Sequence, residues 1–370
     1  MRKIGFIAVF VLMSFSVFAQ QKQLIDSLIA SANSSIFDRP ERAIEIANQI
    51  LENQKSSATD KISAYIIISS AHSILGKYEK SNEFALKAYN LSNETNDNAS
   101  RLKTLGFVAN QYMDMEMADE AWRYLSQTDE LLKTVSLPDS MQYLVGNINL
   151  LKGWLYQKDL NCEYAIRYFN QAIDVFEKNT ENIYANINLA QAYNQRGFCY
   201  MNIDKDSAKI SLKRGLQEAK HAQVSVLESN ALLGIAEVLS HESNFKASND
   251  SLQRALEIVK ETGEPGMESQ IYKIFTQNYL QLGDKENHLI YKKLFTEQQQ
   301  KSLSDDEAAI NRILKSRIDK NFSQIQKEQN KLGLIYGTGG ILFLLILGFW
   351  GIKIWRKSQK FKQIKAESQN

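Results

Sequence analysis

Residues 153–172 read Gly-Trp-Leu-Tyr-Gln-Lys-Asp-Leu-Asn-Cys-Glu-Tyr-Ala-Ile-Arg-Tyr-Phe-Asn-Gln-Ala, and this stretch decides the fold. Gly153 is a small residue in an apolar run, which predicts a helix with a close neighbour at that position. Asp159 and Asn161 then mark a turn. After the turn, a small-large-small stripe recurs at the spacings of one helix face; it consists of Ala165, Phe169 and Ala172. The stretch therefore predicts two helices joined by a turn, with small residues where they pack.

The composition favours an all-helical chain with a large core. Among 370 residues there are only 3 Pro and 17 Gly, so few positions break a helix, and 44% of the residues are hydrophobic. The formal net charge of +2 is too balanced for a protein that binds nucleic acid. The two cysteines, Cys162 and Cys199, are too few for a disulfide framework or a metal-ligand cluster. They are either buried free thiols or one disulfide between neighbouring repeats, and both alternatives stay open.

The opening pattern recurs along most of the chain. Seven segments fit it, and the small position that begins each second helix lies about 38 to 44 residues after the previous one. These positions are Ala43, Ser81, Ala121, Ala165, Ala208, Ser248 and His288. A single hairpin cannot bury both of its faces, so we expect the hairpins to stack around one continuous core.

In these residues the sequence resembles the tetratricopeptide repeat (TPR) family, which places small residues where two helices touch and aromatic residues between repeats. The resemblance covers roughly residues 24–296. It is carried by Gly153, Tyr156, Ala165, Phe169 and Ala172, with Gly197, Tyr200, Ala121, Ala85 and Ala88 in support. The period exceeds the about 34 residues of the standard repeat, so the helices are expected to be longer. The resemblance implies an all-α fold, a right-handed solenoid of about seven helical hairpins.

In such a solenoid the first helices of the hairpins line a concave inner wall. We count from the small residue of each first helix, which is Ala109, Gly153, Gly197, Ala236 or Thr276. The next residue and those four and five beyond the small residue are expected to point inward, and neighbours one turn earlier join them. The predicted partner-binding groove is lined by Asn110, Asp114, Trp154, Gln157, Lys158, Asn194, Gln195, Phe198, Asn202, Glu237, His241, Gln277 and Gln281. Amides pair with a peptide backbone, and Trp154 and Phe198 supply contact area. The same pattern also fits a solvated wall whose aromatic residues pack against their own repeats.

The two ends of the chain predict export and a membrane anchor. Residues 1–19 have the basic start, apolar run and small-residue ending of a signal peptide, although an uncleaved anchor also fits. We expect a TPR-like solenoid at 20–297, a helical stalk at 298–332, a transmembrane helix at 333–355 and a basic cytoplasmic tail at 356–370. The stalk has a narrow apolar seam, which fits either a homodimeric coiled coil or a single solvated helix.

The segment 333–352 contains no charged residue and is about long enough to cross a bilayer. The Lys and Arg residues that follow it are expected on the cytoplasmic side. The predicted location is therefore the inner (cytoplasmic) membrane, as a single-pass protein with periplasmic repeats.

No residues with the pattern of a catalytic site stand out. The four histidines lie in different repeats and lack ligands at helical spacing, and neither a phosphate-binding loop nor a nucleophile elbow occurs. We therefore expect no enzymatic activity, no cofactor and no metal.

The order of segments is similar to that of Bacteroidetes-type membrane-anchored TPR signalling proteins. In those proteins the span leads to a histidine kinase or a helix-turn-helix domain, and this sequence stops at Asn370 without either. The leading hypothesis is a periplasmic scaffold or sensor that holds a peptide or protein partner in its groove and relays its state to a cytoplasmic partner. The alternatives are a tethered assembly factor for cell-envelope complexes and a sensor remnant without output.

Overall fold

The computed structural model describes residues 22–36, 38–158, 161–262, 265–301, 326, 329, 331, 333, 347 and 349–357. The chain divides into two units, Met1–Phe295 and Thr296–Asn370, and the first contains the array of helices. Its elements are a helix at residues 22–35, α2 (Pro40–Glu52), α3 (Ala58–Ile74), α4 (Tyr78–Asn93), α5 (Asn98–Asp114), α6 (Ala118–Thr134), the short 3-10 helix η1 (Asp139–Met141), α7 (Tyr143–Lys158), α8 (Cys162–Phe176), α9 (Ile183–Tyr200), α10 (Lys205–His221), α11 (Ser225–His241), α12 (Phe245–Thr262), α13 (Pro265–Leu282) and a helix that begins at residue 285.

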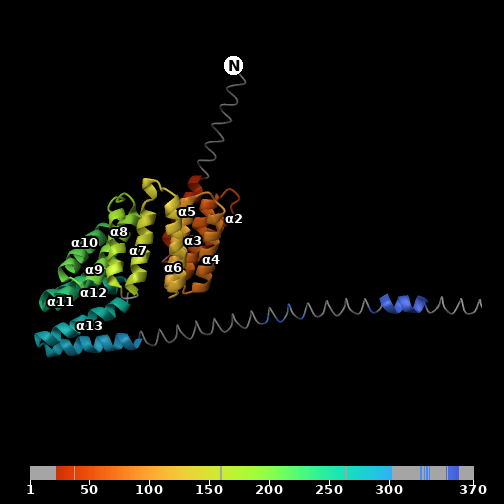
Figure 1. The fold of residues 1–370 in the computed structure, drawn as a ribbon. Coiled ribbons are helices and arrows are strands. Elements are labelled where there is room, and N and C mark those ends of the chain that lie inside the picture. Colours follow the sequence, from red (N-terminus) through yellow and green to blue (C-terminus); the bar gives the residue numbers. More distant parts are fainter. Residues whose placement is uncertain are drawn as a thin grey trace, which may run out of the picture. The chain divides into compact units, whose positions relative to one another are not determined.

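Consecutive helices pair into hairpins, and the hairpins stack in chain order (Figure 1). The helix at residues 22–35 pairs with α2, α3 with α4, α5 with α6, and so on to α13 and the helix that follows it. From α3 to α13, each first helix also packs against its counterpart in the next hairpin. The predicted all-α array of helical hairpins is confirmed for the part of the chain that the structure describes.

Small residues allow the two helices of a hairpin to approach closely. A Cβ atom on Gly153 of α7 would overlap the ring of Phe169 on α8, and one on Gly197 of α9 would overlap Leu212 of α10. The predicted stripe on α8 is fully buried, because Ala165, Phe169 and Ala172 expose none of their surface. The Phe169 ring therefore occupies the space that the missing side chain of Gly153 leaves, as the sequence pattern predicts.

Local chemistry fixes the ends of the helices. Ser57 caps α3 by accepting a hydrogen bond from the backbone N–H of Asp60, whose carboxylate accepts one from the backbone N–H of Ser57 in return. Pro40 begins α2, where a missing N–H costs nothing. The turn inside several hairpins needs one residue with positive φ, and Gly76 and Gly283 provide it at +66° and +72°.

A disulfide links two neighbouring hairpins. Cys162 of α8 is bonded to Cys199 of α9, with Cα atoms 5.1 Å apart. Of the two alternatives that the sequence leaves open, the structure contains the disulfide. It ties the second helix of one hairpin to the first helix of the next.

One junction between hairpins differs from the others. From α2 to α13, the last helix of each hairpin packs closely on the first helix of the next, except that α6 and α7 have few close approaches (Figure 1). The segment 135–142, which contains η1, connects these two helices. Here too α7 packs against α5, whose Gly106 lies beside Ile148 and Leu151, and one apolar core includes residues of α5, α6 and α7.

The prediction of a transmembrane helix at 333–355, and the single-pass inner-membrane location that follows from it, must be corrected. No helix in the described part of the chain is long and apolar enough to cross a bilayer, which takes about 20 mostly apolar residues. The described stretch there, residues 349–357, is short and carries Lys353, Arg356 and Lys357. Residues 334–346 and 348 of the predicted span lie outside the described residues.

The other predictions for the two ends of the chain fall mostly outside the described residues. The predicted signal peptide at 1–19 does so completely, as do most of the stalk at 298–332 and of the tail at 356–370. They stay predictions.

Candidate functional site

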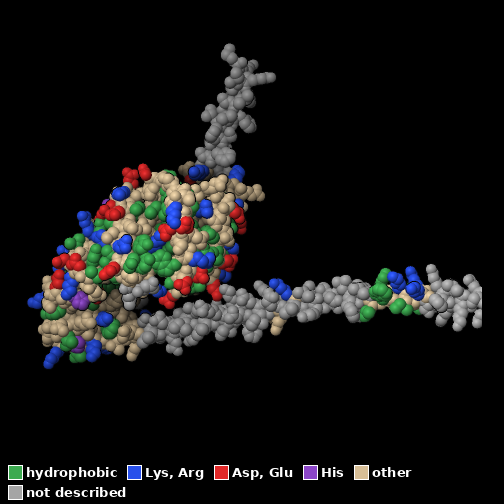
Figure 2. Space-filling model, in the orientation of Figure 1, with side chains coloured by type: hydrophobic (Ala, Val, Ile, Leu, Met, Phe, Trp, Pro, Cys, Tyr) green, Lys and Arg blue, Asp and Glu red, His purple; other side chains and the backbone are tan. Residues whose placement is uncertain are grey.

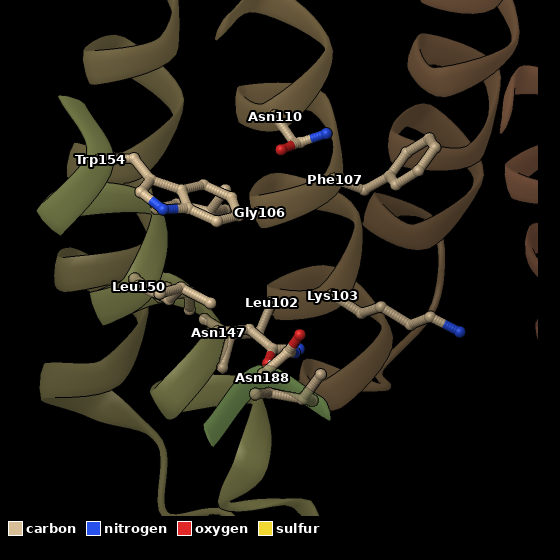
Figure 3. Close-up of a pocket in the computed structure, with 12 residues that line it drawn as sticks. Leu102, Lys103, Gly106, Phe107, Asn110, Asn147, Leu150, Trp154 and Asn188 are labelled. Atoms are coloured by element: carbon tan, nitrogen blue, oxygen red, sulfur yellow. The ribbon is translucent and has the colours of Figure 1, made fainter. Parts of the chain in front are cut away.

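A hollow of about 300 Å³ opens between α5, α7 and α9, all of them first helices of their hairpins (Figure 3). Its floor is apolar and its rim carries amides. The floor consists of Leu102, Gly106, Phe107, Leu144, Ile148, Leu150, Leu151 and Trp154, and the polar lining of Lys103, Asn110, Asn147 and Asn188. An apolar concavity with a few polar groups at its edge is the usual form of a ligand site.

The structure brings together two of the residues that the sequence predicts for the groove. Asn110 of α5 and Trp154 of α7 line the same hollow, although they come from different hairpins. Trp154 is half-buried and packs against the apolar clusters on both sides of it. Phe198 holds the equivalent place on α9, is half-buried, and packs near Gly234 of α11. Both aromatic residues therefore contact the core, and Trp154 also lines the hollow.

One predicted residue has a structural role instead. The side chain of Asn194 is buried, with 1% of the residue exposed, and its Nδ2 donates a hydrogen bond of 2.9 Å to the carbonyl oxygen of Leu227. That bond joins α9 to α11. The side chain of Asn194 is therefore closed to a partner.

The remaining predicted residues are accessible but lie outside the hollow. Lys158 is paired with Glu116 across an exposed 3.5 Å ion pair, and the carbonyl oxygen of His241 accepts a hydrogen bond from Lys205. Asp114, Lys158, Asn202, His241, Gln277 and Gln281 are exposed, and Gln157, Gln195 and Glu237 are half-buried.

A row of amides on the same helices is absent from the predicted groove residues. Asn147 lies six residues before Gly153, and an amide stands at the equivalent position in each of the next three hairpins. The row consists of Asn147, Gln191, Asn230 and Gln270, all half-buried or exposed. Asn147 lines the hollow and accepts a hydrogen bond of 2.7 Å from Nδ2 of Asn188. Because stacked hairpins repeat the same geometry, the other three amides occupy the matching position on their own helices.

The surrounding helices shift the pKa values of two charged groups on α5, Lys103 and Asp114. Partial desolvation lowers the pKa of Lys103, although its side chain stays in contact with solvent. Desolvation raises the pKa of Asp114, whose Oδ2 accepts a 3.4 Å hydrogen bond from Asn110. In both groups the surrounding helices disfavour the charged form.

The face seen in Figure 2 mixes acidic and basic side chains, without a large area of one sign. The described residues contain no group of three or more His, Cys, Asp or Glu side chains arranged to hold a metal ion.

The stacked hairpins, their small packing residues and the wall of first helices define a TPR-like helical-repeat protein. No protein-family model matches the chain. One curated relative, outer dynein arm-docking complex subunit 4 from Danio rerio, is 28% identical over 155 residues, which are 42% of this chain and 30% of that protein. The chain therefore spans about a third of the length of the curated relative.

Comparison with solved structures supports the same class. The apo form of RapI has a TM-score of 0.56 at 13% identity, covering 75% of this chain and 77% of that one. A signal transduction ATPase with a tetratricopeptide repeat sensor from Pyrococcus horikoshii has a TM-score of 0.55 at 15% identity, covering 71% and 38%. A Rap protein complexed with competence and sporulation factor has 0.53 at 15%, covering 79% and 82%. At these identities the likeness concerns the fold.

Proposed function

We propose that this protein is a binding scaffold that holds an extended segment of a peptide or partner protein along the wall of its first helices. The observation that carries the proposal is the hollow between α5 and α7 together with the row of amides that continues from Asn147 across the following hairpins. An extended chain presents backbone N–H and C=O groups along its length, and amide side chains both donate and accept hydrogen bonds.

The apolar floor of the hollow adds binding affinity that hydrogen bonds to the amides do not provide. Hydrogen bonds to a peptide largely replace bonds to water, so each adds only modest net affinity. Burial of one large apolar side chain against Trp154, Phe107 and Ile148 adds a larger, non-directional term. The combination fits a ligand that is held by its backbone and anchored by one apolar side chain.

The fold comparison supports this proposal at the level of class. One solved structure of similar fold is a Rap protein complexed with competence and sporulation factor, so this architecture accommodates a bound partner in at least one other protein. We propose a binding protein rather than an enzyme. Relay of the bound state to a second partner is a further part of the proposal.

The test uses peptide selection on the full chain. A random 15-residue displayed peptide library is panned against the wild type, and the affinity of selected peptides is measured by fluorescence polarisation. Removal of three amides, Asn147→Ala with Gln191→Ala and Asn230→Ala, should weaken binding about a hundredfold, since each lost hydrogen bond is worth about 1 kcal/mol.

The matched control removes amides from second helices. Gln217 of α10 and Gln253 of α12 are exposed there, and Gln217→Ala with Gln253→Ala should leave the affinity unchanged. Far-UV circular dichroism confirms that both variants are folded. If no peptide is selected, or if the control loses as much affinity as the triple variant, the wall is not the binding surface.

A further inference from the structure

The last described hairpin of the array, α13 with the helix that begins at residue 285, carries much exposed apolar surface (Figure 1). Twelve large apolar side chains are exposed in the described part of residues 22–295, and four of them lie between residues 280 and 290. These four are Leu280, Leu282, Leu289 and Ile290. The outer face of a terminal repeat is normally polar. This hairpin therefore has the composition of an interface.

Leu280 occupies a position that contacts the next hairpin elsewhere in the array. It lies four residues after Thr276, the small-residue position of α13. The equivalent residue of α9 is Met201, which is buried in an apolar cluster with residues of α11. The equivalent residue of α11 is Ser240, which donates a 2.6 Å hydrogen bond to Asn278 of α13. On α13 itself this position is apolar and 59% exposed.

Leu289 repeats this relationship on the second helix of the hairpin. It directly follows His288, and the equivalent residues of three earlier second helices are Trp122, Lys209 and Asn249. Each of the three contacts the hairpin that follows it. The first meets a tyrosine ring of α7, the second forms a 2.7 Å ion pair with the residue after α11, and the third accepts a 2.8 Å hydrogen bond from α13. Leu289 is 64% exposed, so here too an interface position presents a leucine to solvent.

Contacts between the two helices hold these leucines in place. The ring of Tyr291 stacks on Phe275 and Tyr279 of α13, with centroids 4.3 and 5.5 Å apart. Nδ1 of His288 lies 2.9 Å from the carbonyl oxygen of Thr276, which joins the helices at a second point. Because the hairpin is already ordered, a partner that binds it pays little conformational entropy.

We call the surface that carries Leu280 and Leu289 the terminal face, and we propose that it binds the terminal face of a second copy of this chain about a two-fold axis. A two-fold interface places the same residues on both sides, so the leucines of one copy meet those of the other. Two helices packed on two helices also join the earlier hairpins, so the contact continues the interface that runs through the array. Charge does not oppose it: residues 265–295 contain four Lys and three Asp or Glu residues, and a nearly neutral surface favours association.

The experiment measures self-association of the full chain by sedimentation equilibrium, under non-reducing conditions that preserve the native disulfide. The wild type should form dimers. Leu280→Glu with Leu289→Glu brings like charges together across the two-fold axis and should weaken dimerisation about a hundredfold.

The matched control removes two comparably exposed apolar side chains from the hairpin of α9 and α10. Ile203 and Ile210 are 53% and 63% exposed there, and Ile203→Glu with Ile210→Glu should leave dimerisation unchanged. Far-UV circular dichroism confirms that both variants are folded. Leu280→Gln with Leu289→Gln replaces the charged variant if that one fails to fold, and it should also weaken the dimer.

A single spin label then locates the contact, because pulsed electron paramagnetic resonance on a singly labelled chain reports only distances between copies. A label at Glu286→Cys, close to the terminal face, should give a shorter distance than one at Ser126→Cys on α6; both positions are exposed. The reverse order overturns the proposal.

Three results of the sedimentation experiment also overturn it. A wild type that stays monomeric at about 0.1 mM leaves the terminal face to a different partner, such as an amphipathic helix of another protein. A dimer that the Leu280 and Leu289 variant leaves unchanged has its contact elsewhere, for example along residues 298–332. A dimer that the control weakens as much associates through apolar surface in general. Because no arm uses a peptide, failure here leaves the peptide-selection result standing.

Discussion

Cys162, the first residue of α8, is bonded to Cys199, the penultimate residue of α9. The two cysteines lie 37 residues apart and belong to neighbouring hairpins. The bond therefore closes a loop that contains all of α8 and nearly all of α9. It restricts the unfolded chain while it holds two repeats together in the folded one.

Reduction of this disulfide should destabilise the array. For a loop of 37 residues the expected loss is about 2–4 kcal/mol in the free energy of unfolding. Urea unfolding with and without dithiothreitol measures it. The variant with Cys162→Ser and Cys199→Ser should be as unstable as the reduced wild type and should no longer respond to the reductant. A wild type that responds no more than this variant would show that the thiols are not joined.

Replacement of Gly153 should distort the hairpin of α7 and α8. A Cβ atom there overlaps the Phe169 ring, so Gly153→Ala should cost about 1–3 kcal/mol in the free energy of unfolding. Gly106→Ala is the matched control, because its Cβ would lie 3.8 Å from Ile148 and Leu151, an ordinary contact distance. That control should be neutral or gain up to about 1 kcal/mol from helix propensity. Chemical denaturation measures the free energy of unfolding of both variants. Equal changes in the two would contradict the close packing of Phe169 against Gly153.

The sequence predicts the packing of the hairpins well because that packing depends on local spacing. Gly153, Ala165 and Phe169 are at helical intervals, and the complementary shapes they form follow from their sizes. The stripe on α8 and the fit of Phe169 against Gly153 are both confirmed.

The predicted wall is correct only in part, because exposure depends on contacts between hairpins. Asn194 has the chemical character and the approximate register of a groove residue, yet it is buried against the Leu227 carbonyl oxygen of the next hairpin. The amide row was recoverable from the sequence. Asn147, Gln191 and Asn230 recur near the period of the repeat, but they lie six residues before the small residue of the first helix, further back than the one turn over which the groove is predicted.

Substitutions at the positive-φ residues of two hairpin turns should change stability in opposite directions. Gly283 adopts a φ of +72° and nothing lies within 4 Å of the position of a Cβ atom, so the cost of Gly283→Ala is purely conformational. Ser243 adopts a φ of +61° at the equivalent turn between α11 and α12. Gly283→Ala should lose about 1 kcal/mol of stability, and Ser243→Gly should gain a similar amount. Thermal unfolding of the two single variants tests this, and a shift of the same sign in both would contradict it.

His72 should make the stability of the array depend on pH. Its side chain is buried on α3, its Nδ1 lacks a hydrogen-bond partner, and its ring lies 5.7 Å from that of Phe84. Burial, followed by the nearby charges of Lys80 and Lys77, lowers its pKa below the ordinary value of 6.5, while Glu83 opposes the shift.

The sign of the effect follows from this shift. The unfolded chain binds a proton at His72 as the pH falls below 6.5, whereas the folded chain does so only at lower pH. Acid therefore favours unfolding: stability is fully present above pH 6.5 and declines below it until the pKa of the folded state is passed. Within that window the loss due to this residue approaches about 1.4 kcal/mol per pH unit.

Urea unfolding at about pH 7.5 and about pH 5.5 measures the difference. His72→Phe should reduce the loss of stability on acidification, because an apolar ring of similar size binds no proton and keeps the contact with Phe84. His241→Gln, at an exposed position on α11, should respond to pH as the wild type does. An unchanged acid response in His72→Phe would mean that other groups govern the acid sensitivity of the fold.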